Sequence, residues 1–498
     1  GGTGRLLEKN GIIFKNISDY TQTDEMFNGR VKTLHPKIQG GILFRRDIVD
    51  DIKDAERYNI PPIDLVVCNL YPFKAVISKP TATLTEALEM IDIGGPTMIR
   101  AAAKNYPAVT VIINSKHYPL ILKELRENGG AVSEKTRAFL AQEVFTTMAE
   151  YNANIANYLQ SINFPDKKFG DKLMKLYKKE QDVRYGENWD QDAAFYSDLS
   201  ADLGLQNIKQ ISGKEISFNN YLDIDACMQV LLEFGTQDYI CSIFKHTTPN
   251  GVAIDKKSQL NAVKRAFNTD PLSAFGGIWG LNKKLTIEIA DFIVNQKKIF
   301  VEVLLAPSYE ENALEILKTK KNMRILKFGE DLLIKREKIY KNPEIRGVLG
   351  GVLIQDYDFG PIIKEWKVVC KRKISKDEKE ALIFAYKVCK YAKSNSAVFV
   401  KWDYDGIYTI GIGAGQQSRI HVVKLAYQKA LELGHALFGS VIGTDSFFPF
   451  PDGLEVAVKA GAVAIINPGG SIRDDEVIRK ADDLNCGLVF CGKRVFRH

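Results

Sequence analysis

The chain has 498 residues, of which 45% are hydrophobic and 26% charged, the composition of an ordinary globular protein with about two to four domains. Its net charge of +7 comes from 68 basic and 61 acidic residues. This near balance excludes the strongly basic surface typical of nucleic-acid-binding proteins. No apolar run approaches the ~18 residues of a membrane-spanning helix, so no membrane partner is expected. The seven cysteines are scattered without a C-x-x-C pair, which favours a reducing, cytoplasmic compartment.

Residues 1–160 alternate short apolar runs with helical patterns, which predicts an α/β domain. Residues 65–70 and 109–113 are expected to be strands, and residues 134–159 have the length and periodicity of a helix. The chain opens on a glycine turn that runs into a helix, so the first strand of this domain is expected to be missing. The lysine-rich, weakly patterned residues 161–182 are predicted to be a linker.

Residues 183–498 again alternate strand and helix patterns and form the second predicted domain. A polar, irregular interval at 316–345 is expected to divide this domain into two halves. Strands are predicted at residues 239–244, 348–354, 397–400, 407–412, 462–466 and 488–491.

The segment 445–476 has the strongest pattern of a ligand site. Phe447, Phe448 and Phe450 crowd together between polar residues, with Pro449 and Pro451 stiffening the backbone, and a helical pattern follows from residue 454. A buried strand, a Pro-Gly-Gly-Ser loop and an acidic helix start come next. This order places free backbone N–H groups at the carboxyl edge of a sheet, where α/β proteins bind ligands. The three aromatic rings favour a flat heteroaromatic ligand, and the alternative is a proline-rich corner before an ordinary strand–helix unit.

Lys245 and His246 follow an apolar strand and precede a predicted Thr-Thr-Pro-Asn-Gly turn. Histidine is the usual side chain for proton transfer near neutral pH. A neighbouring lysine can stabilise developing negative charge. The alternative is that both side chains are ordinary surface groups.

The glycine-rich segment 411–421 also follows a predicted strand, and its Arg419 could make a bidentate contact with a phosphate or carboxylate. It lacks the glycine spacing of a dinucleotide-binding fingerprint, and a simple tight turn is the alternative. Residues 270–277 form a second turn of this kind. The six histidines are far apart in sequence, so no metal site is expected.

The N-terminal region has a set of cationic and acid/base groups. Arg30, Lys32 and Thr33 share one turn, which is a suitable inventory for binding phosphate. Three acid/base groups, Tyr71, Asp92 and Lys104, are expected to face a common cleft beside this anion site. The alternative is that each of them is a solvated surface group.

Many motifs in a fixed order resemble those of one family, the bifunctional AICAR transformylase/IMP cyclohydrolases of purine biosynthesis, where AICAR is aminoimidazole carboxamide ribotide. The motifs run over nearly the whole chain: GRVKTLHP, NLYPF, DIGG, RAAAKN, RYGEN, KHTTPNGVA, DPLSAFGG, GIGAGQQSRIH, FFPFPDG and NPGGSIRDDEV. The resemblance implies an N-terminal methylglyoxal-synthase-like α/β domain and a transformylase region of two cytidine-deaminase-like halves without zinc.

The resemblance also implies two reactions. A formyl group passes from 10-formyltetrahydrofolate to AICAR, and the product then closes its second ring with loss of water to give inosine monophosphate. It further implies a homodimer whose transformylase site is completed across subunits. No metal is implied for either reaction.

In the transformylase, His246 resembles the base that takes a proton from the substrate's amino group, and Lys245 resembles the group that stabilises the oxyanion. The residues that match folate contacts are Ile420, Asp452, Ser471 and Ile472. The residues that match ribotide contacts are Arg184, Tyr185, Gly276, Glu302, Asn395, Arg419, Phe447 and Arg494.

In the cyclohydrolase, Lys104 resembles the acid/base residue, with Lys32, Tyr71 and Asp92 as further catalytic candidates. Arg30, Thr33 and Ile93 match substrate contacts in the nucleotide cleft.

The chain departs from the family pattern in two places. The family usually begins with a strand and a nucleotide-binding Ser-Asp-Lys-Thr-Gly turn, and this sequence has neither before Gly1. Because both belong to the cyclohydrolase domain, an enzyme that retains only formyl transfer is the alternative function. The family usually carries Pro-His where this chain has Trp189 and Asp190. Two other classes are a nonreacting nucleotide- or folate-binding module, which Lys245 and His246 disfavour, and a zinc deaminase, whose ligands the sequence lacks.

Overall fold

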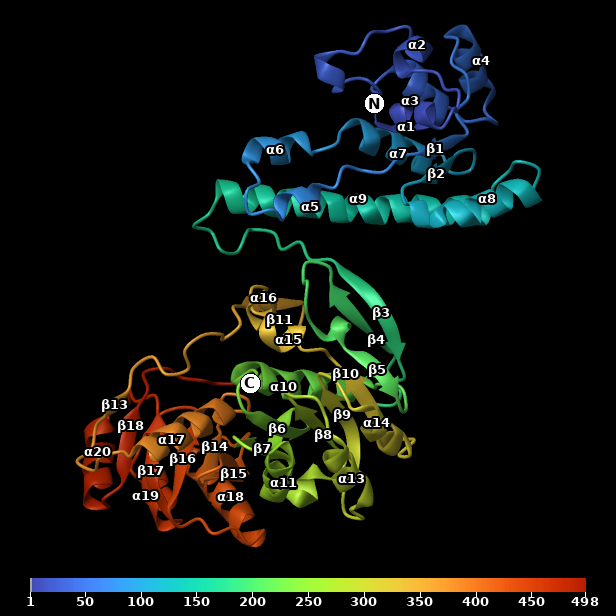
Figure 1. Cartoon of the computed structure of the whole chain (residues 1–498). Helices are drawn as coiled ribbons and strands as arrows, with labels where there is room; N and C mark the ends of the chain where they lie inside the picture. The colour runs from blue at the N-terminus through green and yellow to red at the C-terminus, as the bar shows by residue number, and fades with distance from the viewer. Residues whose placement is uncertain (1) are drawn as a thin grey trace. The chain divides into compact units, whose positions relative to one another are not determined.

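The computed structural model describes residues 2–498, and the chain divides into an N-terminal unit, Gly1–Leu176, and a C-terminal unit, Tyr177–His498 (Figure 1). Each unit has its own hydrophobic core. No helix within residues 2–498 is both long enough and apolar enough to cross a membrane.

The N-terminal unit is a small α/β structure around two parallel strands, β1 (Leu65–Val67) and β2 (Thr110–Ile112). Both predicted strands are confirmed, although each is shorter than expected. The predicted long helix is also confirmed and runs further, as α9 (Glu134–Asn163), with Ser133 accepting the N–H of Thr136 at its start. The remaining helices are α1 (Gly2–Lys9), α2 (Ile17–Thr21), η1 (Phe27–Gly29), α3 (Pro36–Leu43), α4 (Val49–Arg57), α5 (Phe73–Ile77), α6 (Leu84–Glu89), α7 (Gly94–Lys104), η2 (Ser115–His117) and α8 (Tyr118–Glu127).

The C-terminal unit opens on an antiparallel pair, β3 (Tyr177–Val183) and β4 (Ala193–Asp198). Strand β3 occupies the end of the interval 161–182, where the sequence predicts a linker. All its residues except Val183 are exposed, so the strand carries lysines in place of the apolar alternation that would identify it. A second antiparallel pair, β11 (Glu344–Val348) and β12 (Gly351–Gln355), replaces the single strand predicted at 348–354.

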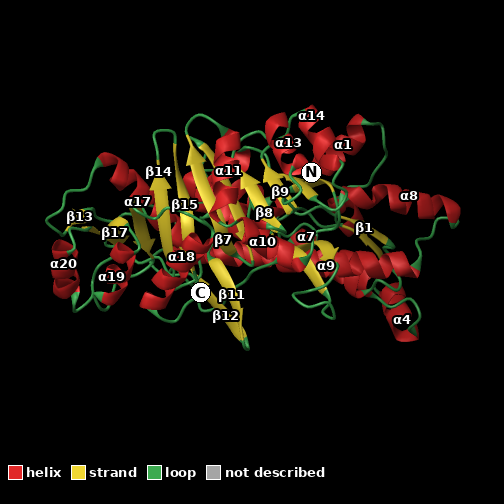
Figure 2. Cartoon of the chain, turned by 90° about the horizontal axis from the view of Figure 1, so that it is seen from below, coloured by secondary structure: helices red, strands yellow, loops and turns green. Residues whose placement is uncertain are grey.

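The main sheet of this unit has twelve strands in the order β13-β18-β17-β16-β14-β15-β7-β6-β8-β9-β10-β5. Figure 2 shows its strands side by side with helices packed against them. The strands are β5 (Lys209–Ser212), β6 (Tyr239–Lys245), β7 (Thr248–Asp255), β8 (Gly277–Leu281), β9 (Val301–Ala306), β10 (Arg324–Lys327), β13 (Lys367–Val368), β14 (Ala397–Trp402), β15 (Gly406–Gly413), β16 (Ser440–Thr444), β17 (Ala462–Asn467) and β18 (Gly487–Phe490).

The helices of the C-terminal unit cover both faces of the sheet, since successive strand residues point to opposite sides. In β6, Ile240 and Phe244 join one core cluster, while Cys241 and Ile243 join another. The helices are α10 (Phe218–Phe234), α11 (Gln259–Thr269), α12 (Pro271–Ala274), α13 (Ile287–Asn295), α14 (Glu311–Lys318), α15 (Asp331–Ile334), α16 (Arg336–Ile339), α17 (Lys376–Cys389), α18 (Arg419–Glu432), α19 (Asp452–Lys459) and α20 (Asp474–Asp483), with the short η3 (Leu205–Asn207).

One order of elements occurs twice along the C-terminal unit. A helix, a hairpin and three further helix–strand steps make up α10 to β10, and the same order makes up α17 to β18. The two copies join in the middle of the sheet, where β7 pairs antiparallel with β15. The predicted break at 316–345 is therefore too early, because β10 lies inside that interval and belongs to the first copy.

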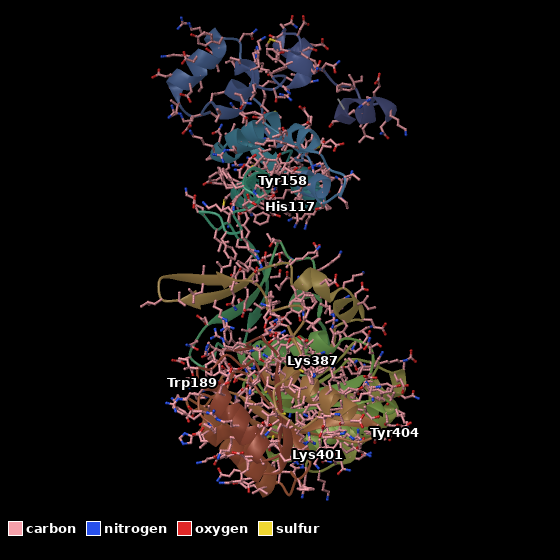
Figure 3. All side chains as sticks on the ribbon, turned by 90° about the vertical axis from the view of Figure 1, so that its left-hand side faces the viewer. His117, Tyr158, Trp189, Lys387, Lys401 and Tyr404 are labelled. Carbon is pink, nitrogen blue, oxygen red and sulfur yellow. The ribbon has the colours of Figure 1, made fainter. Side chains whose placement is uncertain are left out.

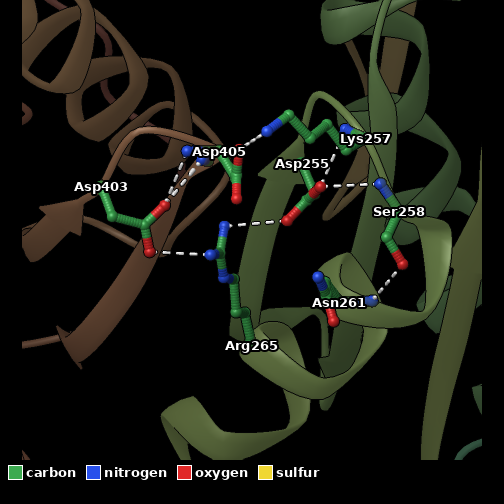
Figure 4. Close-up of polar contacts among 8 residues, drawn as sticks. Asp255, Lys257, Ser258, Asn261, Arg265, Asp403 and Asp405 are labelled. Atoms are coloured by element: carbon green, nitrogen blue, oxygen red, sulfur yellow. Dashed lines mark hydrogen bonds and ion pairs between the residues drawn. The ribbon is translucent and has the colours of Figure 1, made fainter.

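A network of ion pairs holds the two copies together beside the β7–β15 pairing (Figure 4). Arg265 of α11 binds Asp255 at 2.9 Å and Asp403 at 2.7 Å, and Lys257 binds Asp405 at 2.7 Å. Asp255 has 0% exposure and also accepts the N–H groups of Lys257 and Ser258. Arg265 is thus the cationic partner of a fully buried carboxylate and links it to the second copy.

Replacing Arg265 with alanine should lower the free energy of unfolding of the C-terminal unit by about 3 kcal/mol, because it leaves the Asp255 charge buried without its cation. Lys256→Ala is the matched control: its pair with Glu380 is long, at 3.7 Å, and exposed, so its loss should cost less than about 1 kcal/mol. Urea unfolding, followed by tryptophan fluorescence, measures the free energy of unfolding of both variants. Equal effects of the two variants would contradict this role of Arg265.

Candidate functional site

The β6–β7 connection is a two-residue turn made by His246 and Thr247, flanked by the paired residues Lys245 and Thr248. Both turn residues have left-handed backbones, with φ of 52° for His246 and 57° for Thr247, as a type I′ hairpin turn requires. The predicted turn over Thr-Thr-Pro-Asn-Gly is wrong, because β7 begins at Thr248 and contains the Pro-Asn-Gly part. The tight turn exposes the His246 side chain at the end of the hairpin.

The ends of two neighbouring strands lie next to this turn. Lys245 Nζ donates to the carbonyl oxygen of Phe275 at 2.8 Å. The N–H of Gly276, which has a φ of +74°, donates to the carbonyl oxygen of Phe300 at 2.7 Å. The rings of Phe275 and Phe300 lie 5.2 Å apart. The structure therefore brings Lys245, His246 and Gly276 together beside the Phe275–Phe300 ring pair.

Glu302 and the Arg184–Tyr185 pair are held by different contacts. Glu302, in β9, binds the buried Arg324 at 2.6 Å. Arg184 follows β3, is exposed, and donates to the hydroxyl of its neighbour Tyr185 at 2.6 Å. Trp189, in the loop after it, is 85% exposed and lies at the rim of the C-terminal unit in Figure 3. Asp190 beside it is exposed as well.

The sequence analysis did not single out Asp223 of α10, which contacts the same turn. Its carboxylate accepts the N–H of His246 at 3.2 Å and that of Thr247 at 2.5 Å. Burial raises the pKa of the Asp223 carboxyl above its usual value, while these two bonds and the charges of His246 and Lys245 oppose the shift. No motif marks this aspartate, because its role depends on how α10 packs beside β6.

A second polar cluster surrounds Asp445, which is fully buried at the end of β16. Asp445 forms an ion pair with Arg419 and accepts the hydroxyl of Ser394 at 2.6 Å. The amide nitrogen of Asn395 donates to the carbonyl oxygen of Gln416 at 2.7 Å. Arg419 is therefore fixed by a carboxylate, and the remaining N–H groups of its guanidinium stay available for an anion.

The aromatic segment after β16 has a divided role. Phe448 is 1% exposed and packs in the core, where a Cβ at Gly453 would lie 2.6 Å from its ring. Phe447 is half-buried, and Phe450 is exposed with the Arg473 guanidinium 4.7 Å from its ring centre. The prediction of three ligand-facing rings is therefore wrong for Phe448, which the core requires.

The glycine loop after β17 has fewer free N–H groups than its sequence predicts. Gly469 N–H donates to Asn467 at 2.8 Å, and Gly470 N–H donates to Asp474 at 2.7 Å. The predicted acidic helix start is confirmed, since α20 begins at Asp474, whereas α19 begins at Asp452, two residues before the predicted start at 454. Ser471 is half-buried, whereas Ile472 and Arg494 are exposed, with Arg494 lying over the Phe496 ring.

Apart from the loop between β3 and β4, which belongs to a separate two-stranded sheet, these groups lie along one edge of the main sheet. Strands β6, β15, β16, β17 and β18 end at this edge, and β8, β9 and β14 begin there, as the pairing directions require. The second polar cluster lies at the end of β16, where Val495 N–H donates to the carbonyl oxygen of Asp445. Strands β6 and β16 are four positions apart, which corresponds to roughly 19 Å at about 4.8 Å per strand. One chain therefore carries two groups of candidate residues, one beside His246 and the other from Asn395 to Arg494.

In the N-terminal unit, Asp92, Ile93 and Thr33 gather at the start of α7. Asp92 N–H donates to the Tyr151 hydroxyl at 2.8 Å, and the Asp92 carboxylate accepts Gly95 N–H at 3.0 Å. A Cβ on Gly94 would lie 2.4 Å from the Thr33 hydroxyl oxygen, so Thr33 touches the helix start. Ile93 is exposed at this point.

The other predicted cleft residues are placed differently. Arg30 forms an exposed ion pair with Glu89, and the half-buried Lys32 forms an ion pair with Glu25, so both cations already have anionic partners. Tyr71 is exposed. Burial raises the pKa of the Tyr151 phenol, and the charges of Asp92 and Tyr71 add smaller contributions in the same direction.

Lys104 is at the opposite end of α7 from Asp92. The helix has 11 residues, so its ends are about 15 Å apart. Lys104 lines a cavity of about 730 Å³ together with Arg100, Gln142 and Phe145. The predicted common cleft of Tyr71, Asp92 and Lys104 is therefore not formed within one N-terminal unit, because α7 separates its members.

Within residues 2–498, no three His, Cys, Asp or Glu side chains are grouped so that they could hold a metal ion. The candidate sites consist of proton-transfer groups, cations and backbone N–H groups.

Comparison with known proteins gives matches to two family models and to solved structures. The model of the AICARFT/IMPCHase bienzyme family matches residues 102–429, and the model of the MGS-like domain matches residues 1–97. A solved structure described as "Crystal structure of ForH" is 35% identical in sequence, with a TM-score of 0.28, over 31% of this chain and 81% of that chain.

Proposed function

Because the chain belongs to the AICARFT/IMPCHase bienzyme family, we propose that His246 and Lys245 carry out formyl transfer and that Lys104 acts in ring closure. The chain is a bifunctional transferase and hydrolase of de novo purine biosynthesis, AICAR transformylase and IMP cyclohydrolase, and its family uses a formyl-folate. The observation that carries the residue assignment is the β6–β7 turn, which exposes His246 beside Lys245 at the site edge of the sheet.

In the proposed transfer, the amino nitrogen of AICAR attacks the formyl carbon of 10-formyltetrahydrofolate. His246 takes the proton that this nitrogen loses. The ammonium of Lys245, held by the Phe275 carbonyl, stabilises the oxyanion. The bond from the formyl carbon to the folate nitrogen then breaks, and that nitrogen takes up a proton. The products are formyl-AICAR and tetrahydrofolate.

The other contacts of the transfer site are proposed from the family motifs that these residues match. Arg184, Tyr185, Gly276, Glu302, Asn395, Arg419, Phe447 and Arg494 are assigned to the ribotide. Ile420, Asp452, Ser471 and Ile472 are assigned to the folate. Exposed cations such as Arg184 and Arg494 suit the ribotide phosphate, and the exposed Ile472 suits an aromatic folate ring.

Ring closure is assigned to the N-terminal unit and formyl transfer to the C-terminal unit. In ring closure the carboxamide nitrogen of formyl-AICAR attacks the formyl carbon, and one water leaves to give inosine monophosphate. Tyr71, Asp92 and Lys104 are proposed to exchange the protons, with Lys32, Arg30, Thr33 and Ile93 lining the nucleotide site. All seven cysteines are free thiols, which supports a cytoplasmic location.

A homodimer explains why each candidate site is divided within one chain. Val495, next to Arg494, donates its N–H to the carbonyl oxygen of Asp445 at the end of β16. Strands β16 and β6 are four positions apart in the sheet, roughly 19 Å at about 4.8 Å per strand, and α7 separates Asp92 from Lys104. A two-fold dimer brings different parts of the same surface together, so each site can take one group from each subunit.

Mixed dimers test this proposal. His246→Ala and Arg494→Ala should each be nearly inactive in formyl transfer. Co-expression of the two should restore about one quarter of the wild-type sites, since half of the dimers are mixed and each has one intact site. If both residues serve a site within one chain, every site lacks one of them. Activity of the mixture at the level of the single variants would therefore contradict the shared site.

A further inference from the structure

The turn that carries His246 has an unfavourable backbone. Both His246 and Thr247 have left-handed φ values, and a β-branched residue such as threonine rarely adopts one. Hairpin turns of this type normally contain Asn or Gly. A contact from outside the hairpin is therefore needed to keep this turn in place.

Asp223 supplies that contact. It lies in α10, and its carboxylate accepts N–H groups from both left-handed residues, His246 at 3.2 Å and Thr247 at 2.5 Å. The two carboxylate oxygens bind one N–H each. The carboxylate thus binds the backbone of the turn and leaves the imidazole of His246 free.

The charge of Asp223 also acts on the same residues. Its carboxylate interacts electrostatically with both His246 and Lys245. These are the cationic groups that face it across the turn. A fixed negative charge at this place stabilises the positive charge that His246 gains when it takes the proton of the substrate.

We infer that Asp223 is a positioning residue for formyl transfer: its carboxylate holds the His246–Thr247 turn in its left-handed conformation and thereby aims the imidazole at the substrate. This inference rests on the proposed role of His246. Small displacements of a catalytic group cost large factors in rate, whereas the ribotide contacts of Arg184 and Arg494 do not depend on the turn.

The test is steady-state kinetics of the full-length Asp223→Asn and Asp223→Ala variants. Asparagine keeps the shape but has one acceptor oxygen, so one of the two N–H groups loses its partner. We expect kcat for formyl transfer to fall about 10- to 100-fold, with KM for AICAR within about threefold and ring closure unchanged. Alanine should lower kcat at least as far as asparagine.

The control is Asp403→Asn in the corresponding hairpin of the second copy. One carboxylate oxygen of Asp403 accepts the N–H groups of Asp405 at 3.0 Å and Gly406 at 2.9 Å, and the other binds Arg265 at 2.7 Å. Asparagine can therefore keep both backbone bonds and loses only the ion pair with Arg265, away from the His246 turn. This variant should keep formyl-transfer kcat near the wild-type value.

Three results would overturn the inference: Asp223→Asn with kcat within twofold of wild type, a rise in KM alone, or parallel loss of both activities with a lower melting temperature. His246→Ala is measured in the same series. If that variant stays active, the proposed function itself fails. If it is inactive while Asp223→Asn is normal, only the role of Asp223 fails.

Discussion

Replacing His246 with alanine is expected to lower kcat of formyl transfer by about two to four orders of magnitude, the usual contribution of a positioned acid/base group. The loss should fall on kcat, because the ribotide phosphate is assigned to Arg184 and Arg494, which the substitution leaves in place. The exposed side chain at the tip of a two-residue turn has little packing to lose, so the fold should survive.

The control for this substitution is His435→Ala. His435 is the imidazole that bonds to the carbonyl of Thr269 at 3.1 Å, outside the assigned site, and its loss should leave kcat within a few fold. Rapid-quench or steady-state assays with AICAR and 10-formyltetrahydrofolate compare the two. Near-normal turnover of His246→Ala would remove His246 from the mechanism.

Replacing Lys104 with alanine should abolish ring closure by a similar factor, about 10²- to 10⁴-fold, and leave formyl transfer intact. The reason is that Lys104 belongs to the N-terminal unit, whose core contains none of the residues assigned to formyl transfer. The variant should therefore accumulate formyl-AICAR.

Lys116→Ala is the matched control for Lys104, since Lys116 is an exposed lysine of the same unit paired with Glu143. It should close the ring at the wild-type rate. Product analysis by liquid chromatography separates formyl-AICAR from inosine monophosphate. Loss of both activities in a folded Lys104→Ala variant would argue for a single shared site.

Strong local patterns predicted part of the fold, and the main-sheet strands β5, β7, β8, β9, β10, β13 and β16 were not predicted. The strands β6, β14, β15, β17 and β18 and the long helix α9 lie where apolar periodicity placed them. Sequence patterns failed to predict strands whose residues do not alternate between apolar and polar. Strand β3 is exposed and lysine-rich, so nothing in it alternates. The apolar run at 348–354 contains Gly350, whose φ of +74° turns one expected strand into a hairpin.

The sequence predicted which residues belong to the candidate sites, but it did not predict how these residues are arranged in space. Lys245 and His246 are adjacent in sequence, and the structure places them together with Gly276. Asp92 and Lys104 also seemed to form a pair, but only the length of α7 reveals that its two ends are far apart. Phe448 cannot be distinguished from Phe447 by sequence, and the packing against Gly453 decides between core and site.

Isotope transfer tests the central claim, that one chain moves a formyl group to AICAR and closes the ring. The enzyme is incubated with AICAR and 10-formyltetrahydrofolate carrying ¹³C in the formyl group, and the products are followed by ¹³C NMR. The label should pass through the formyl group of formyl-AICAR into the newly closed purine ring of inosine monophosphate. A nucleotide pool without label would contradict formyl transfer, and label that stops at formyl-AICAR would contradict ring closure.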